Sequence, residues 1–315
     1  MIGNLGNLST EQVNENTRHI DMCGTRDILE LINTEDMAVP LAVMREIPNI
    51  EKAVDAITER IKRGGRLFYA GAGTSGRLGI LDASECPPTF GTKPELVQGI
   101  IAGGNEAVYK AVEGAEDSEE LGRAAINERH VTASDVVVGI TASGRTPFVI
   151  GAVKQAKALG AITVGISNSI EPEIEKEVDM AITPFVGPEV IMGSTRMKAG
   201  TAQKLVLNMI TTSVMIKLGK VYGNLMVDLQ PSNIKLIDRT VRIVMHATGA
   251  DYEKAGEYLD LSGSNPKTAI VMIKAGCGRE QAESLLKEAD GFVTKALELF
   301  ENPLRKAVGQ HESEL

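Results

Sequence analysis

Two glutamates beside glycine-rich loops are the residues of this chain best suited to chemistry. Glu85 follows the loop Gly71-Ala-Gly-Thr-Ser-Gly76, and Glu116 follows Gly103-Gly104. A carboxylate near an anion-binding loop can remove a proton from a phosphorylated substrate, while a second carboxyl group protonates a leaving oxygen. The pairing therefore indicates proton transfer on a phosphorylated substrate rather than simple binding.

Each glutamate also has a plainer interpretation. Glu85 could equally cap a helix or form an ion pair, although the consecutive prolines after Cys86 should end its helix and fix the loop beyond it. Glu116 competes with four neighbouring acids, most of which we expect at the solvated surface: Glu113, Asp117, Glu119 and Glu120. The residue pattern alone does not choose among these acids.

The first glycine-rich loop satisfies G-x-G-x-x-G between a predicted strand and a predicted helix, which suggests a dinucleotide site. Such a site also needs an acidic residue about twenty positions further on, at the end of the next strand. The next predicted strand, Leu96–Ile101, ends in Ala102-Gly103-Gly104 instead. The sequence therefore disfavours a dinucleotide.

Hydroxyl groups make these loops better candidates for phosphate binding. Thr74 and Ser75 stand at a predicted helix N-terminus, where free amides and the helix dipole favour an anion. A second such loop, Thr141–Pro147, follows another predicted strand, and two loops at one sheet edge favour a phosphate or sugar site over helix capping. Arg77 could assist or could be solvated. The predicted phosphate ligands are Thr74, Ser75, Ser143, Gly144, Arg145, Thr146 and, from a third and weaker helix start, Ser194 and Lys198.

Short apolar runs alternating with helical segments must position these loops. Buried strands separated by amphipathic helices predict an α/β fold, a mostly parallel sheet with helices on both faces. Such sheets bind ligands beyond the carboxyl ends of their strands, where the loops after Ala70 and Ile140 lie. The predicted strands are Leu67–Ala70, Leu96–Ile101, Val136–Ile140, Ile162–Ile166 and Met180–Ile182, with helical segments at Phe148–Leu159 and in the run Asn105–Arg129.

The rest of the chain reads as helical. Residues 9–63 carry a capping box at Ser9 and an apolar stripe at Ile50, Val54, Ile57 and Ile61. A long helix is predicted over Thr195–Leu218, and Ser232 is a plausible N-cap for the first helix of the C-terminal segment. Breaks at Gly249, Gly263 and Gly276 separate helices at roughly 233–247, 251–260, 266–275 and 279–299. We expect N-terminal helices over 1–63, a phosphosugar-binding domain over 64–225 and a small all-helical domain over 226–315.

Composition narrows the class of protein further. A hydrophobic content of 43% over 315 residues is ample for a core, and no apolar run predicts a membrane span or a signal peptide. The net charge of −9 disfavours nucleic acid and anionic membranes as partners. The three scattered cysteines suit a reducing compartment, and the four histidines form no metal-ligand pair, so we expect a cytoplasmic protein without a metal.

Several motifs together resemble one family. The loops resemble those of the sugar isomerase (SIS) domain, which binds phosphosugars at the ends of a parallel sheet. Nearly the whole chain, C-terminal helices included, resembles the N-acetylmuramic acid 6-phosphate etherases, and Ser84-Glu-Cys-Pro-Pro-Thr-Phe90 is the most specific stretch. The stretches that carry the resemblance are Gly71–Gly79, Asp82–Gly91, Ala111–Asp117, Gly193–Lys204 and Asn224–Asp228.

The resemblance implies a lyase that cleaves the lactyl ether at carbon 3 of N-acetylmuramic acid 6-phosphate. Elimination followed by water addition would give N-acetylglucosamine 6-phosphate and D-lactate. The resemblance makes Glu85 the proton donor and Glu116 the base, requires no metal or organic cofactor, and implies a homodimer with sites near the subunit interface. Two alternatives stay open: an aldose–ketose isomerase acting on a phosphosugar, and a non-catalytic phosphosugar sensor like the glucokinase regulatory protein, which resembles these etherases.

Overall fold

The computed structural model describes residues 9–229 and 234–302, which form two compact units. Unit 1 holds the chain up to Glu85 together with Lys93–Thr212. Unit 2 holds Cys86–Thr92 and the chain from Ser213 onward. Compactness does not show which segments fold independently, so the division into 1–63, 64–225 and 226–315 stays a prediction.

A five-stranded parallel sheet forms the centre of unit 1. Its strands run in the order β2-β1-β3-β4-β5, and the residues of β1 and β3 are all buried, as expected for strands covered on both faces. Each strand lies within one residue of its predicted position, and the predicted α/β fold is confirmed. The strands are β1 (Leu67–Gly71), β2 (Val97–Ile101), β3 (Val136–Ile140), β4 (Ile162–Ile166) and β5 (Met180–Ile182).

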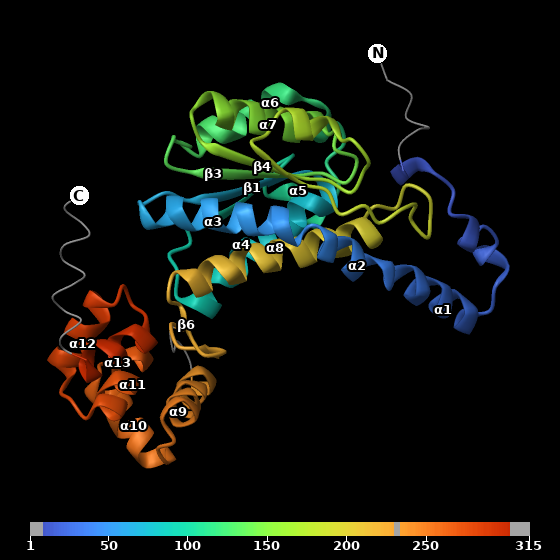
Figure 1. Cartoon of the computed structure of the whole chain (residues 1–315). Coiled ribbons are helices and arrows are strands. Elements are labelled where there is room, and N and C mark those ends of the chain that lie inside the picture. The colour runs from blue at the N-terminus through green and yellow to red at the C-terminus, as the bar shows by residue number, and fades with distance from the viewer. Residues whose placement is uncertain (1–8, 230–233, 303–315) are drawn as a thin grey trace. The chain divides into compact units, whose positions relative to one another are not determined.

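Helices cover both faces of this sheet (Figure 1). Phe68 packs in one cluster with Phe148 and Val149 of α7 (Pro147–Ala158), which lies against α6 (Glu119–Glu128). Tyr69, the next residue of β1, points to the opposite face and meets Gly79 of α4 (Gly73–Phe90). The result is a three-layer α/β/α arrangement.

The N-terminal part of unit 1 is helical, as predicted. Ile50, Val54 and Ile57 of the predicted stripe are buried. The long helix α8 begins at Lys198, three residues later than predicted, because a turn occupies residues 194–197. The helices are α1 (Thr25–Asp36), α2 (Ala38–Arg45), α3 (Ile47–Lys62) and α8 (Lys198–Lys217), with short 3-10 helices at Ser9–Glu11, Glu15–Thr17, Ile20–Met22 and Glu173–Lys176.

Two helix predictions in the first half of the chain were wrong. The run Asn105–Arg129 divides into α5 (Glu106–Tyr109), a 3-10 turn at Ala115–Asp117 and α6, because Gly114 adopts a left-handed backbone with φ of 72°. The prolines after Cys86 do not end α4, which continues through Pro87 and Pro88 to Phe90. Helical φ suits proline, and the buried side chains of Cys86 and Phe90 anchor the last turn despite the two missing amide donors.

Unit 2 is mainly helical, and Gly249, Gly263 and Gly276 all adopt positive φ at the predicted breaks. The predicted helix 279–299 is two helices instead, because Asp290 and Gly291 both adopt positive φ. Ser232, the predicted N-cap, lies outside the described residues. The elements are a hairpin of β6 (Val221–Tyr222) and β7 (Leu225–Met226), then α9 (Ile234–Thr248), α10 (Tyr252–Leu261), α11 (Pro266–Ala275), α12 (Arg279–Glu288) and α13 (Val293–Glu301).

The close contact between α6 and α7 depends on two glycines and gives a first prediction. A Cβ on Gly122 would collide with the Phe148 carbonyl oxygen, and a Cβ on Gly151 would collide with the Glu119 carbonyl. We expect Gly122→Ala to destabilise the protein by roughly 1–3 kcal/mol, because the two backbones must separate.

Thermal unfolding measures this effect, and Gly256→Ala is the matched control. Gly256 lies within α10 with open space around its Cβ position, so alanine should raise the stability there by roughly 0.5–1 kcal/mol. Equal effects of the two substitutions would contradict the packing explanation.

Candidate active site

The pairing of β1 with β3 brings the two predicted phosphate loops to the same edge of the sheet. Gly71, the last residue of β1, is the register partner of Ile140, the last residue of β3. The loops after these residues therefore start from adjacent strands, about 5 Å apart. The strand order reverses at β1, and this switch point is where open α/β sheets form a ligand crevice.

The first loop is a tight turn from β1 into α4. Gly73 has φ of 52°, and a Cβ on Gly76 would lie 2.6 Å from Ile101 Cγ1 and 2.9 Å from the Gly71 carbonyl oxygen. Only glycines allow the start of α4 to approach the strand this closely. The turn leaves the free amides of the α4 N-terminus at the sheet edge, where they can bind an anion.

Ser75 is buried at this turn and belongs to a chain of hydrogen bonds. Its hydroxyl donates to Gln203 Oε1 at 2.8 Å, Gln203 Nε2 donates to Asn168 Oδ1 at 2.9 Å, and Asn168 Nδ2 donates to the Pro184 carbonyl at 3.1 Å. The chain links α4 to α8 and to the segments after β4 and β5. Thr74 is half-buried and stays the more accessible of the two predicted hydroxyls.

The second loop is organised by its own hydroxyls. Thr141 Oγ1 lies 2.8 Å from Thr146 Oγ1 and accepts the Gly144 amide at 3.2 Å, while Ser143 Oγ accepts the Arg145 amide at 3.3 Å. Gly144 has φ of 74° and sits against Pro172, so a side chain there would collide. The loop is therefore held in one shape before any ligand arrives.

The third predicted phosphate site is filled by carboxylates of the chain itself. Glu189 accepts the amides of Lys198 and Ala199 at 2.8 and 2.9 Å, and thus caps α8. The buried Lys198 ammonium donates to Glu35 at 2.7 Å. Burial opposes the charge of Glu35, yet hydrogen bonds led by Lys198 outweigh it and lower its pKa. Ser194 and Lys198 as phosphate ligands stay predictions.

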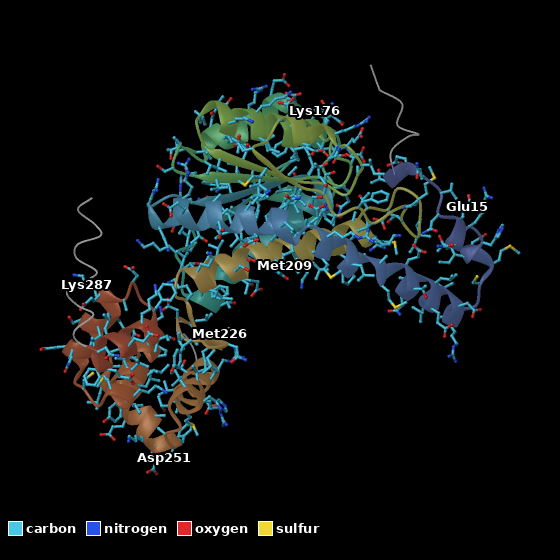
Figure 2. The ribbon with its side chains drawn as sticks, viewed as in Figure 1. Glu15, Lys176, Met209, Met226, Asp251 and Lys287 are labelled. Atoms are coloured by element: carbon cyan, nitrogen blue, oxygen red, sulfur yellow. The ribbon has the colours of Figure 1, made fainter. Side chains whose placement is uncertain are left out.

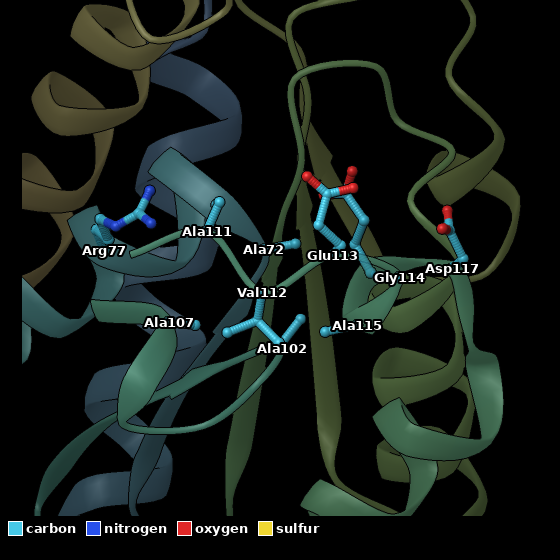
Figure 3. Close-up of a pocket in the computed structure, with 12 residues that line it drawn as sticks. Ala72, Arg77, Ala102, Ala107, Ala111, Val112, Glu113, Gly114, Ala115 and Asp117 are labelled. Carbon is cyan, nitrogen blue, oxygen red and sulfur yellow. The ribbon is translucent and has the colours of Figure 1, made fainter. Parts of the chain in front are cut away.

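A pocket of about 370 Å³ opens where β1 and β2 end, and Glu116 lines it (Figure 3). Ala72 and Gly73 from the first loop and Arg77 from α4 form one part of its wall. The rest of the wall comes from Ala102, from Ala107 and from the segment that carries the acids. The residues of that segment are Ala111, Val112, Glu113, Gly114, Ala115, Glu116 and Asp117. Of the predicted site residues, Glu116 lines this pocket and the others do not.

Glu85 lies elsewhere on the same unit. Its side chain is exposed, and residue 85 follows residue 73 by 12 positions, which is about 18 Å along α4. That distance exceeds the reach of a glutamate side chain. The single chain therefore does not bring Glu85 into the pocket that Glu116 lines.

Asp82, one turn before Glu85, is a buried acid that the sequence analysis did not single out. It accepts hydrogen bonds from Asn208 Nδ2 at 2.7 Å, Tyr69 Oη at 3.0 Å and Thr211 Oγ1 at 3.1 Å. Burial raises the pKa of Asp82, and these hydrogen bonds only partly offset that effect. Asp82 thus joins α4 to β1 and α8 immediately before the exposed turn that carries Glu85.

Gln203, Asn168 and Glu189 were also missed, although each is at most 1% exposed. The local pattern gave little signal, since Gln203 stands between Ala202 and the charged Lys204. Within residues 9–229 and 234–302, no group of three or more His, Cys, Asp or Glu side chains is arranged to hold a metal ion. In the same residues, no helix has the length and apolar character needed to cross a membrane.

Comparison with known proteins gives the same class as the fold and the two loops. Residues 49–157 match the glucokinase regulatory protein N-terminal SIS domain, and residues 109–213 match the SIS domain. The parallel sheet with phosphate-type loops at its carboxyl edge is thus that of an SIS-domain protein.

Full-length relatives then identify the family. An N-acetylmuramic acid 6-phosphate etherase of Clostridium acetobutylicum is 66% identical over 95% of this chain and 99% of that relative. Etherases of the same name from Caldanaerobacter subterraneus and Clostridioides difficile are 57% and 54% identical, over 94% and 96% of this chain and 96% and 99% of their own lengths. The chain belongs to the N-acetylmuramic acid 6-phosphate etherase family.

The buried carboxyl group of Asp82 predicts a pH-dependent stability. Because its pKa is higher in the folded protein than the ordinary 3.8, the unfolded chain ionises first as the pH rises, and this favours unfolding. Asn has nearly the same shape without the charge. We expect the melting temperature of Asp82→Asn to rise relative to the wild type between about pH 4 and about pH 7.

Asp135 supplies the opposite control in the same unit. Burial opposes its charge, but hydrogen bonds led by Arg66 outweigh it and lower its pKa. Its ionised form therefore stabilises the fold above its ordinary pKa of 3.8 and does so less in acid. The melting temperature of Asp135→Asn should fall relative to the wild type as the pH rises to about 5, and the difference should stay constant above that. If the melting temperatures of both variants changed in the same direction relative to the wild type as the pH rises, the opposite pKa shifts of Asp82 and Asp135 would be refuted.

Proposed function

We propose that this chain cleaves the D-lactyl ether of N-acetylmuramic acid 6-phosphate to give N-acetylglucosamine 6-phosphate and D-lactate. The observation that carries the proposal is the 66% identity, over 95% of the chain, to a relative whose name states this substrate and reaction. The pocket supports it, since Glu116 lines a cavity beside the free amides of the α4 N-terminus. No metal or organic cofactor takes part in the proposed chemistry.

Glu116 acts as base and Glu85 as acid in the elimination. In the open-chain sugar the proton on carbon 2 is acidic because an aldehyde adjoins it. The Glu116 carboxylate takes this proton, the released electron pair forms a second bond between carbons 2 and 3 to give a double bond, and the bond from carbon 3 to the ether oxygen breaks. The lactate oxygen takes that bonding pair and accepts the proton of the Glu85 carboxylic acid.

Hydration restores both glutamates. Glu85, now a carboxylate, takes a proton from water while the hydroxide oxygen bonds to carbon 3 of the unsaturated aldehyde. Carbon 2 regains a proton from the Glu116 carboxylic acid. The sum is substrate plus water giving N-acetylglucosamine 6-phosphate plus lactate, with each glutamate back in its starting protonation state.

Charge determines which end of the site receives the phosphate. Glu113, Glu116 and Asp117 line the pocket together with the cation Arg77, so acids predominate and this end repels a phosphate group. The α4 N-terminus and the loop Thr141–Pro147 offer amides and hydroxyls instead. We place the phosphate there, with Thr74, Ser143 and Thr146 as its foremost ligands, and the reacting carbons toward Glu116.

The separation of the two glutamates leads us to propose that a second copy of the chain completes the site. Glu85 of one copy would protonate the leaving oxygen in the pocket that contains Glu116 of the other. The assembly would be a homodimer with two equivalent sites, because a two-fold contact presents the same surface on both copies.

Exposed apolar side chains on unit 1 support this dimer. Leu81, one turn earlier on α4, is 51% exposed, and Met209 of α8 lies at the surface (Figure 2). Helix α1 buries none of its residues, and Figure 1 shows it extending away from the sheet. Leu29, Met37, Leu41 and Met44 are each more than half exposed. Such apolar surface typically marks a protein interface.

A cytoplasmic location belongs to this proposal as well. The three cysteines are free and far apart in the sequence, as is usual for proteins of a reducing compartment.

Replacing either glutamate tests the assigned chemistry. We expect Glu85→Gln and Glu116→Gln each to lower D-lactate release by roughly 10²–10⁴-fold, because glutamine keeps the shape but transfers no proton. Exchange of the carbon-2 proton with deuterated solvent should persist in Glu85→Gln and stop in Glu116→Gln. Wild-type exchange without lactate release would favour a phosphosugar isomerase, and binding without either reaction would favour a sensor.

Mixing the two inactive variants tests the shared site. In a mixed dimer, one site has both glutamates replaced and the other has both intact. An equal mixture, unfolded and refolded together, should therefore regain about a quarter of wild-type activity. If both glutamates came from one chain, the mixture would stay inactive. Each variant refolded alone is the control.

A further inference from the structure

Arg77 joins helix α4 to the segment that carries Glu116, here called the Glu116 loop (residues 110–118). Its Nε donates to the Val108 carbonyl at 3.0 Å, and its Nη2 donates to the Lys110 carbonyl at 3.4 Å. Arg77 also lines the pocket that Glu116 lines (Figure 3). A side chain from the helix that we assign to phosphate binding thus holds the start of the loop that we assign to the base.

The Glu116 loop has few other restraints. Its acids, Glu113, Glu116 and Asp117, are all exposed. Val112 packs on the backbone of Gly103, where an added Cβ would lie 2.8 Å from the Val112 Cβ. Ser118 ends the loop as the N-cap of α6, accepting the Leu121 amide at 3.2 Å. The hydrogen bonds of Arg77 thus hold the beginning of the Glu116 loop, the packing of Val112 holds its middle, and the cap at Ser118 holds its end.

The guanidinium suits this task better than other cations. Its planar group carries several donors in fixed directions, so it can bond two carbonyl oxygens at once, whereas a lysine ammonium is a single flexible point of charge. Arg77 follows Gly76 directly in the first turns of α4. Any shift of the α4 N-terminus is therefore passed to Lys110 and to the loop.

We propose that Arg77 is a positioning residue that sets the place of the Glu116 carboxylate by holding the carbonyls of Val108 and Lys110. This inference rests on the proposed function, in which Glu116 removes the carbon-2 proton. Arg77 ties the base to the same helix end that receives the phosphate, so the distance from phosphate to base is built into one rigid link.

The proton-transfer step can be measured nearly alone in a Glu85→Gln background, where we expect lactate release to be slow. We would follow deuterium incorporation at carbon 2 of N-acetylmuramic acid 6-phosphate at saturating and limiting concentrations. Adding Arg77→Ala should slow exchange at saturation by about 10- to 100-fold, the effect of misplacing a catalytic group by about 1 Å. The concentration for half-maximal exchange should change little, and Arg77→Lys should restore only part of the rate.

Arg60→Ala is the matched control, because Arg60 of α3 also donates to a backbone carbonyl, that of Ala133, at 2.6 Å. It should leave exchange unchanged. If Arg77→Ala does not fold, as judged by thermal unfolding, Arg77→Gln replaces it, since an amide can hold one carbonyl but not both.

The outcomes separate this inference from the proposed function. If Glu116→Gln fails to stop exchange, the proposed role of Glu116 is wrong, whatever Arg77 does. If Glu116→Gln stops exchange but Arg77→Ala leaves the saturated rate unchanged, the positioning role is overturned. If Arg77→Ala only raised the substrate concentration needed for half-maximal exchange, Arg77 would be a substrate ligand instead. Full rescue by Arg77→Lys would show that only its charge matters, and would overturn the proposal too.

Discussion

The in-register pairing of β1 between β2 and β3 is the constraint on which the site depends. Gly71 ends its strand level with Ile101 on one side and Ile140 on the other, so three chain segments leave the sheet at one edge. The turn into α4 begins after Gly71, and the loop Thr141–Pro147 begins after Ile140. The segment that leads to Glu116 begins after Ile101. A register shift of one residue would turn every side chain of β1 to the other face and separate the loops.

Buried polar contacts keep the helices aligned with that edge. The chain from Ser75 to Pro184 and the three donors to Asp82 both connect α4 with α8, at the start of α4 and again near Glu85. Unpaired, such buried groups would be costly, so each contact restricts the helices to one arrangement. Helix α4 therefore acts as a rigid rod, with free backbone amides at its start and an exposed acid about 18 Å away.

Regular features of the fold could be predicted from the sequence, since they reflect periodicity and burial. The strands are continuous apolar runs, and the breaks at Gly249, Gly263 and Gly276 reflect a backbone freedom specific to glycine. The interruption near Gly114 was missed because the surrounding acids and alanines are good helix formers. The arrangement of the candidate site depends on contacts between residues far apart in the sequence. Lys198 pairs with Glu35, and Arg77 donates to carbonyls more than thirty positions later. Local pattern does not determine such contacts.

The path of the chain between the units affects how the protein is made. Cys86–Thr92 belongs to unit 2, although most of that unit begins at Ser213. The backbone of Gly91 packs against the carbonyl of Asp228. On the ribosome the N-terminal part of the chain emerges first. The last turn of α4 therefore cannot make its contacts within unit 2 until residues after Ser213 have been synthesised, long after the sheet. For the same reason, a single cut after Thr212 would release unit 1 together with Cys86–Thr92, and that segment would lack the rest of unit 2.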